Sequence, residues 1–260
     1  MSKGTALVTG AAQGIGKAIA LRLADDGFNV AVNDIPANAE KLLEVVKEIK
    51  AKGRASSEHL ADVSVEEQVK SMVAEVARVH DGIDVMVANA GVTHKWATLA
   101  DLSVDEWDRV MTINGRGPFL CYKYAGMQMV GQGRGGRIIG ASSVVGKQGS
   151  AGFAAYTASK CAVRGLTQVA AVEFGSHGIT VNAYAPGPID TDLLADFDAS
   201  TAKGTGMAPG GLKEGAKQAT ALKRLGTPTD IANLVSFIAS KESGFITGQS
   251  LSVNGGLFFD

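Results

Sequence analysis

Short apolar segments recur along the whole chain and alternate with longer segments of helical periodicity. The apolar segments have the length of buried β-strands, and the longer segments space their apolar residues as amphipathic helices do. The strand-like segments are 5–8, 29–33, 83–88, 137–140, 179–183 and 250–253, with a weaker one at 55–61. The helical segments are 15–26, 39–52, 65–80, 104–129, 156–177 and 229–240. Because parallel strands need a crossover connection, usually a helix, this alternation predicts a parallel sheet with helices on both faces.

The same alternation bears on the number of domains. A chain of 260 residues has room for two small domains or one large α/β domain. Since strand and helix alternate from the first segment to the last, we predict one doubly wound domain (1–260) with seven parallel strands, a Rossmann fold. The segment 189–223 interrupts the rhythm and is rich in Gly, Ala, Ser and Thr. Because ordered-looking sequence resumes after it, we expect a mobile substrate lid there rather than a linker.

Three polar residues mark expected helix starts. Ser64 and Ser103 each precede a Glu by three residues, and Thr229 stands before an apolar run. Side-chain oxygens at such positions accept hydrogen bonds from the free N–H groups of a helix's first turn. We therefore predict that Ser64, Ser103 and Thr229 are N-caps.

Charge and cysteine content exclude several classes of partner and site. Lys and Arg number 25 against 26 Asp and Glu, so no basic excess exists to bind nucleic acid or an anionic membrane surface. Cys121 and Cys161 lie in no CxxC or Cys/His cluster, which argues against a disulfide framework and against a metal site. No apolar run reaches the roughly 18 residues of a transmembrane helix, and the pattern of a secretory signal is missing, so we expect a cytoplasmic protein.

A glycine-rich turn follows the first predicted strand. The stretch Thr9-Gly-Ala-Ala-Gln-Gly-Ile-Gly16 stands between a strand and a helix, where glycines allow a pyrophosphate to approach the positive end of the helix. The second strand ends at Asp34, 18 positions after Gly16. An acidic side chain there accepts hydrogen bonds from the ribose hydroxyls of a dinucleotide and repels a 2′-phosphate. The pattern predicts binding of NAD (NADH) in preference to NADP.

Two further polar sites follow the third and fourth predicted strands. Asp62 follows the third strand, and Asn89-Ala90-Gly91 follows the fourth. In an open α/β sheet, ligands bind beyond the carboxyl ends of the strands at the point where the strand order reverses. We therefore expect Asp62 to bond the adenine amino group and the stretch from Asn89 to Gly91 to pass close under the cofactor.

Tyr156 and Lys160 form the most specific cluster together with Ser143. Tyr156 and Lys160 are four residues apart at the start of a predicted helix, so both side chains lie on one face. Lowering the pKa of a phenol from about 10 to about 7 takes about 4 kcal/mol. An exposed ion pair supplies about 1 kcal/mol at most, so we expect a partly desolvated pocket beside a positive nicotinamide ring. This predicts a general acid/base, with Ser143 placed to hold the substrate oxygen.

These motifs together resemble the short-chain dehydrogenase/reductase family over essentially the whole chain. The matching features are the glycine-rich turn, Asn89-Ala90-Gly91, Asn114, Ser143 thirteen residues before Tyr156, the run from Tyr156 to Lys160, and Pro186-Gly187 to Thr191. The resemblance implies that Tyr156 is the acid/base and that Lys160 binds the nicotinamide ribose and lowers the pKa of the tyrosine. It further implies that Ser143 polarises the carbonyl and that Asn114 holds a water in a proton relay to Lys160. Ile189 and Thr191 would contact the nicotinamide carboxamide.

The motifs and the resemblance together give three sets of expected site residues. The catalytic set is Asn114, Ser143, Tyr156 and Lys160. The cofactor-binding set is Gly10, Gln13, Gly14, Ile15, Gly16, Asp34, Ile35, Asp62, Val63, Asn89, Ala90, Gly91, Tyr156, Lys160, Pro186, Gly187, Ile189 and Thr191. The substrate set is Ser143, Val144, Val145, Gln148, Ser150, Phe153, His94, Trp96, Leu193 and Leu194.

Within the family, the chain is most similar to diacetyl/acetoin reductases and 2,3-butanediol dehydrogenases. The stretches that carry this similarity are 14–23, 26–28, 162–168 and 247–251. The similarity implies hydride transfer between NAD(H) and a small ketone or secondary alcohol, with a polyol or sugar dehydrogenase and a 3-oxoacyl thioester reductase as alternatives. Two departures are Val144, which is apolar beside Ser143, and Ala88, which replaces the first Asn of the common Asn-Asn-Ala-Gly.

Two further expectations concern catalysis and assembly. A non-catalytic NAD-binding regulator is the remote alternative, because a fold does not fix function. The presence of the complete catalytic set argues against it.

The family resemblance implies a homotetramer, and the apolar stretch 257–259 suits an interface.

Overall fold

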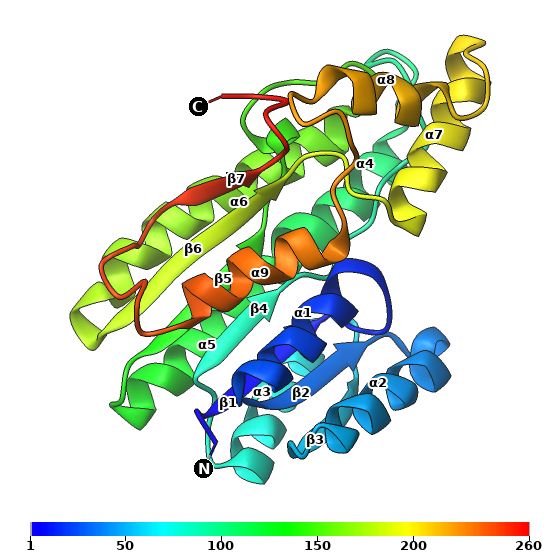
Figure 1. Ribbon diagram of the computed structural model, residues 1–260. Coiled ribbons are helices and arrows are strands. Elements are labelled where there is room, and N and C mark those ends of the chain that lie inside the picture. Colours follow the sequence, from blue (N-terminus) through cyan, green and yellow to red (C-terminus); the bar gives the residue numbers. More distant parts are fainter. Residues whose placement is uncertain (1, 260) are drawn as a thin grey trace.

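The computed structural model describes residues 2–259, and a seven-stranded parallel sheet forms its centre (Figure 1). The strands are β1 (Thr5–Thr9), β2 (Asn29–Asp34), β3 (Ser56–Leu60), β4 (Val85–Ala88), β5 (Gly136–Ala141), β6 (Ile179–Pro186) and β7 (Ser250–Val253). Their order across the sheet is β3-β2-β1-β4-β5-β6-β7, and every neighbouring pair is parallel. The predicted α/β Rossmann fold is confirmed, and the strand order reverses between β1 and β4.

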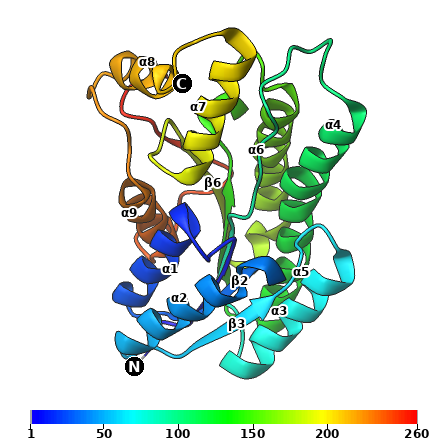
Figure 2. The ribbon, with the colours of Figure 1, turned by 90° about the vertical axis from the view of Figure 1, so that its right-hand side faces the viewer.

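Helices cover both faces of this sheet (Figure 2). One face carries α1 (Gly14–Asp26), α2 (Ala39–Ala51) and α9 (Pro228–Ala239). The other face carries α3 (Glu66–His80), α5 (Gly117–Gln132) and α6 (Ala154–Phe174). No helix within residues 2–259 combines the length and the apolar character needed to cross a membrane.

The side chains of β1 show why this strand is apolar throughout. Ala6 and Val8 point into the core beneath α1 and α9, whereas Leu7 points into the core beneath α3 and α5. All three side chains are fully buried. Successive side chains of a strand face opposite sides, so a central parallel strand is buried on both faces and reads as a continuous apolar run. This explains the signal from which the fold was predicted.

The expected helix 104–129 is not continuous, which corrects that prediction. It divides into α4 (Val104–Met111), a π-helical turn (Thr112–Arg116) and α5. The side chain of Asn114 within the π turn accepts from the Val92 amide at 2.8 Å and donates to the Val92 carbonyl at 2.8 Å. A wider turn inside a helix is frequent at functional sites, and here it orients Asn114 toward the loop after β4.

One of the three predicted N-caps is confirmed and two are wrong. Ser103 accepts a hydrogen bond from the Glu106 amide at 3.3 Å. Ser64 instead donates to Asp62 Oδ1 at 2.7 Å, so α3 begins without a side-chain cap. The N-cap of α9 is Thr227 rather than Thr229, because Thr227 forms a reciprocal capping box with Asp230.

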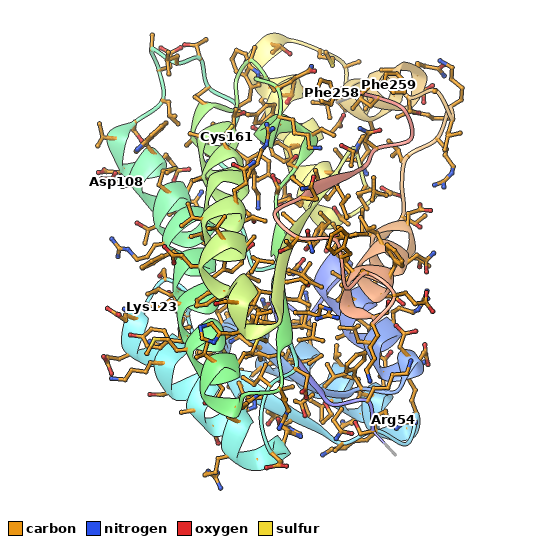
Figure 3. All side chains as sticks on the ribbon, turned by 90° about the vertical axis from the view of Figure 1, so that its left-hand side faces the viewer. Arg54, Asp108, Lys123, Cys161, Phe258 and Phe259 are labelled. Carbon is orange, nitrogen blue, oxygen red and sulfur yellow. The ribbon has the colours of Figure 1, made fainter. Side chains whose placement is uncertain are left out.

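The segment 189–223, expected as a lid, contains two helices, α7 (Asp192–Thr205) and α8 (Gly211–Ala219). The carboxylate of Asp198 joins them by accepting from the amides of Gly210 at 2.6 Å and Lys213 at 3.1 Å. The pair lies above the carboxyl ends of the strands (Figure 1), and the labelled Phe258 and Phe259 of the C-terminal tail lie at the same end (Figure 3). The small residues of this segment therefore do not prevent helix formation. Its mobility stays a prediction.

Candidate active site

The glycine-rich turn joins the end of β1 to the first turn of α1. Gly10 and Gly14 have φ angles of +62° and +56°, which side chains rarely allow, and a Cβ at Gly16 would overlap the Gly10 carbonyl. The N-cap residue Gln13 makes no side-chain cap hydrogen bond, and the first turn of α1 holds no acidic residue. The first N–H groups of α1 and the positive end of its helix dipole thus face the turn, and no acidic residue of that first helical turn competes for them. This arrangement is compatible with a bound pyrophosphate.

Asp34 is fixed beside this turn at the end of β2. Its Oδ2 accepts from the Ala12 amide at 3.1 Å, and its Oδ1 accepts from the Ile35 amide at 2.9 Å and from Asn38 Nδ2 at 2.8 Å. These contacts hold a carboxylate next to the turn, where the adenosine ribose of a dinucleotide would lie. The side chain of Ile35 is exposed.

Asn89 ties the end of β4 to the glycine-rich turn. Its Nδ2 donates to the carbonyls of Thr9 at 2.8 Å and Gly10 at 3.1 Å, and its Oδ1 accepts from the Tyr184 hydroxyl at 2.7 Å. Thr9 Oγ1 accepts in turn from the Asn89 and Ala90 amides, both at 3.0 Å. Tyr184 on β6 was missed by the sequence reasoning, because an aromatic residue inside an apolar strand has the pattern of a core residue.

The expected adenine contacts lie near the end of β3. Asp62 stands two residues beyond the strand, and its Oδ1 accepts from the Ser64 amide at 2.8 Å. Val63 is buried, and its side chain would lie 3.0 Å from a Cβ at Gly117 at the start of α5. Ile15 is partly buried against the core beneath α1. Asp62 is thus placed at the carboxyl edge of the sheet, whereas Val63 and Ile15 mainly pack.

Ser143, Tyr156 and Lys160 meet between the end of β5 and the start of α6. Ser143 caps a short 3₁₀ turn, Val144–Gly146, by accepting from the Val145 amide at 3.3 Å. Lys160 is buried, and its Nζ donates to the Ala141 carbonyl at 2.9 Å and lies 5.4 Å from the centroid of the Tyr156 ring. The three predicted side chains therefore gather at the carboxyl edge of the sheet, where Ser143 and Lys160 are buried and Tyr156 is half-buried.

Burial dominates the ionisation of this cluster. It raises the pKa of Tyr156 to about 12, although a hydrogen bond with the Ser143 side chain acts in the opposite direction. Burial also lowers the pKa of Lys160 to about 8. With a pKa of about 12, the phenol is protonated at neutral pH in the chain alone. Lys160, whose Nζ donates to a backbone carbonyl, has the pKa that lies closer to neutral pH. An additional positive charge at the site would favour the phenolate.

Asn114 lies beside Lys160 at the floor of this cluster. Its Nδ2 is 3.2 Å from the Ser159 hydroxyl, directly before Lys160 in α6. A Cβ at Gly91 would stand 3.2 Å from Asn114 Oδ1 and 3.4 Å from Lys160 Nζ. The missing side chain of Gly91 leaves room where these two polar groups converge.

The residues after β6 form the other wall beside the glycine-rich turn. Pro186 ends β6, and the Gly187 amide donates to the Val253 carbonyl at 2.9 Å. The Thr191 methyl lies 3.8 Å from the position of a Cβ at Gly14, so this wall faces the turn directly. The Ile189 side chain is buried and packs on Gly226 instead, which leaves only its backbone for a cofactor contact.

The Tyr156 ring belongs to an aromatic cluster, which we define as the rings of His94, Phe153, Tyr156 and Phe197. The Phe197 ring on α7 meets the rings of Phe153 at 4.4 Å and Tyr156 at 5.4 Å between centroids, both edge-on. The His94 ring lies 6.1 Å from Phe153. Phe197 was missed from the sequence, although its spacing of four from Leu193 places both on one helix face. Two predicted substrate residues, His94 and Phe153, thus belong to the same cluster as the phenol and are linked to it through Phe197.

Trp96 stands on the outer side of this cluster. Its amide donates to the Ser200 hydroxyl on α7, and the absence of side chains at Gly152 and Gly204 makes room for its ring. A cavity of about 300 Å³ lies here, lined by Trp96, Thr98, Leu99, Ser150, Ala151, Gly152 and Ala154.

The remaining predicted substrate residues lie farther out or are only partly covered. Gln148 and Ser150 are exposed, and Val144, Val145, Leu193 and Leu194 are half-buried. Over residues 2–259, no group of three or more His, Cys, Asp and Glu side chains is arranged to hold a metal ion.

Comparison with known protein sequences gives full-length matches. A family model described as enoyl-(acyl carrier protein) reductase matches residues 10–258. A short-chain dehydrogenase/reductase of Armillaria gallica is 51% identical over 255 residues, which are 98% of this chain and 96% of that protein. The 3-oxoacyl-[acyl-carrier-protein] reductase FabG of Staphylococcus aureus (strain N315) is 46% identical over 254 residues, 98% of each chain.

Solved structures agree with these sequence matches. The crystal structure of NAD⁺-bound xylitol dehydrogenase has a TM-score of 0.94 and 33% identity, covering 98% of this chain and 99% of that chain. A blue fluorescent protein from a metagenomic library, in complex with NADPH, has a TM-score of 0.87 and 35% identity, covering 98% of each chain. The names among these relatives do not include acetoin reductase, so that finer similarity stays a prediction. The chain belongs to the short-chain dehydrogenase/reductase family and is a nicotinamide-dependent oxidoreductase acting on CH–OH and C=O groups.

Proposed function

We propose that the chain interconverts a small ketone of the diacetyl/acetoin type and the corresponding secondary alcohol with NAD(H), using Tyr156 as the acid/base. The observation that carries this proposal is the edge-on contact of the Phe197 ring with the phenol ring, with Phe153 packed against Phe197. Apolar rings beside the phenol favour a compact, uncharged substrate over a bulky or charged one, since charged groups are costly to bury among apolar rings.

NAD is the cofactor that the residues at the adenosine end favour. The nicotinamide cofactor supplies or accepts the hydride when bound. The glycine-rich turn offers unpaired N–H groups to its pyrophosphate, and the Asp34 carboxylate accepts from ribose hydroxyls while repelling a 2′-phosphate. The NADPH-bound structural neighbour shows that the fold also accepts the phosphorylated cofactor, so the choice rests on Asp34.

The arrangement of the catalytic side chains indicates how the proton moves. In reduction, the Tyr156 hydroxyl donates its proton to the carbonyl oxygen as the hydride arrives at carbon, and Ser143 donates a hydrogen bond to the same oxygen. The buried Lys160 ammonium and the oxidised cofactor's positive ring both favour the phenolate that remains. Asn114, convergent with Lys160 beside Gly91, would hold the water through which the phenolate regains a proton.

A polyol dehydrogenase is the second candidate, and the NAD⁺-bound xylitol dehydrogenase neighbour favours it. The FabG relatives keep a 3-oxoacyl thioester reductase as a further alternative. A thioester with a long carrier arm would need an open path to Tyr156, and the cavity beside Trp96 is the candidate entrance.

The test is a substrate panel of diacetyl, acetoin, xylitol and a 3-oxoacyl thioester, each measured with NAD(H) and NADP(H). The proposal expects the highest kcat/KM for diacetyl or acetoin with NADH. It also expects Tyr156→Phe to lose about three orders of magnitude or more in kcat, because the proton donor is gone. Turnover that survives this substitution would contradict the mechanism, and preference for xylitol or the thioester would select that alternative.

We also propose that the protein is a homotetramer. Apolar side chains with exposures between 36% and 84% lie on α4, α5 and α6, among them Trp107, Phe119, Met127 and Val172. Exposed apolar area of this extent on neighbouring helices is typical of interfaces between subunits. Light scattering should give about four times the chain mass of 26.7 kDa, and a monomer would contradict the proposal.

A further inference from the structure

His94 lies in the loop after β4, and the backbone on both sides of it is hydrogen-bonded to side chains of α4 and α7. Directly before it, the Thr93 carbonyl accepts from Arg109 Nη2 at 2.7 Å. Two residues later, the Trp96 amide is bonded to Ser200 on α7. His94 itself is only 2% exposed, and its ring belongs to the aromatic cluster over Tyr156. Its position is therefore determined by the backbone on both sides.

The hydrogen bonding of the ring defines which nitrogen carries the proton. His94 Nδ1 lies 2.7 Å from the Lys95 carbonyl, and a carbonyl can only accept, so Nδ1 carries the hydrogen. A neutral imidazole then has its lone pair on Nε2. This Nε2 atom is buried and has no hydrogen-bond partner within residues 2–259. The chain thus holds an unused acceptor in the aromatic cluster that includes Tyr156.

A buried acceptor without a partner destabilises a protein, so its presence calls for a ligand that satisfies it. The compatible group is a neutral hydroxyl, which donates one hydrogen bond and fits among apolar rings. A second carbonyl offers no donor, and an alkyl group leaves Nε2 unpaired. Phe197 on α7 contacts both Phe153 and Tyr156, and Phe153 is also the neighbour of the His94 ring, so His94 and the phenol belong to one connected set of rings.

We propose that His94 Nε2 accepts a hydrogen bond from a substrate hydroxyl next to the reacting carbon, which makes α-hydroxy ketones and their vicinal diols the preferred substrates. This inference rests on the proposed function and selects within it. It favours acetoin over diacetyl in reduction. Ser143 and Tyr156 hold the reacting oxygen, while His94 recognises the neighbouring one and takes no part in proton transfer.

The kinetic test compares acetoin with butan-2-one, which share a carbon skeleton and differ in the hydroxyl. In His94→Phe, which keeps a ring and removes the acceptor, kcat/KM for acetoin should fall about 10- to 100-fold, and that for butan-2-one should change about threefold or less. His94→Gln, which offers an amide oxygen, should recover part of the loss. Trp96→Phe is the matched control and should affect both ketones alike. An equal effect of His94→Phe on both ketones would overturn the proposal.

A binding measurement separates this inference from the proposed function. With ¹⁵N-histidine labelling and NAD⁺ present, 2,3-butanediol should shift the Nε2 resonance of His94, and butan-2-ol should not. Thermal unfolding of His94→Phe and His94→Gln verifies that both variants fold. If no ketone is reduced but the diol still moves this resonance, the proposed function fails and the hydroxyl site stands. If turnover is observed and the diol leaves the resonance unmoved, the hydroxyl site is wrong.

Discussion

The Tyr184 hydroxyl donates to Asn89 Oδ1 at 2.7 Å, while Nδ2 of the same asparagine donates to the carbonyls of Thr9 and Gly10. Three strands, β6, β4 and β1, are thereby connected through one amide at the point where the strand order reverses. The glycine-rich turn is thus positioned by a side chain from the far half of the sheet. This relationship leads to the first prediction.

Tyr184→Phe should weaken NAD binding about two- to tenfold, because the lost hydrogen bond is worth about 0.5–1.5 kcal/mol and frees the Asn89 side chain that holds the turn. Calorimetric titration with NAD measures the effect. Tyr122→Phe is the matched control, since the Tyr122 hydroxyl is equally buried but bonds Thr167 at 3.0 Å in the core beneath α5 and α6. Equal losses of affinity in both variants would show that the effect is general destabilisation.

Asp34→Ala should reduce the preference for NAD over NADP by about tenfold or more, because it removes the charge that repels a 2′-phosphate. Asp34→Asn separates charge from geometry, since its amide oxygen can still accept from the Ala12 amide. We expect this variant to bind NADP better than the parent while keeping a more stable turn than Asp34→Ala. The ratio of kcat/KM values for the two cofactors is the measurement, and an unchanged ratio would contradict the assignment of Asp34.

Phe197→Ala should widen the substrate range, because the ring that meets both Phe153 and Tyr156 would be gone. We expect kcat/KM for a bulky aryl ketone to rise about tenfold relative to acetoin. Phe237→Ala on α9 is a suitable control, since Phe237 is 41% exposed and α9 covers the face of the sheet opposite to α6, which carries Tyr156. If relative specificity is the same in both variants, Phe197 does not limit substrate size.

Acid should destabilise the fold through a histidine pair at β3. Ser57 Oγ lies 2.8 Å from His59 Nε2 and 2.7 Å from His80 Nε2. Burial lowers the pKa of His59 from its ordinary value of 6.5 against the attraction of Glu75 and Glu58, and burial also lowers the pKa of His80. Below pH 6.5 the unfolded chain therefore binds more protons than the folded chain does. The free energy of unfolding keeps its full value above that pH and decreases as the pH falls below it.

Urea unfolding measured across this pH range checks the prediction. His59→Gln should reduce the slope of unfolding free energy against pH, because one of the two histidines that resist protonation is gone. A parent protein whose unfolding free energy stayed constant or rose on acidification below pH 6.5 would contradict the assignment.

The fold and the positions of the main motifs were predictable because their signals are local. Central parallel strands such as β1 are buried on both faces and read as apolar runs. Each of the main motifs belongs to a single element: the glycine-rich turn, the strand end at Asp34, and the helix that carries Tyr156 and Lys160. Because ligands of such sheets bind at the carboxyl ends of the strands, these motifs could be assigned to one site from the sequence.

The features that the sequence did not reveal depend on contacts between distant segments. Tyr184 and Phe197 have the aromatic character of core residues, and only the assembled structure shows that one holds Asn89 and the other covers Tyr156. Ser64 has the pattern of an N-cap, but the Asp62 carboxylate two residues earlier competes for its hydroxyl. In each case the partner, rather than the residue type, determines the role.

The π turn that interrupts the helix between α4 and α5 has a consequence for chain length. Such a turn contains one residue more than an α-helical turn of the same position, so the site depends on a residue that a continuous helix would not need. Removing Ile113 or Gly115 would allow an uninterrupted α-helix from α4 into α5 and would displace Asn114 from its present position. Asn114 would then lose both hydrogen bonds to Val92. Deletions here would leave a folded protein with a displaced Asn114, a defect that no single substitution reproduces.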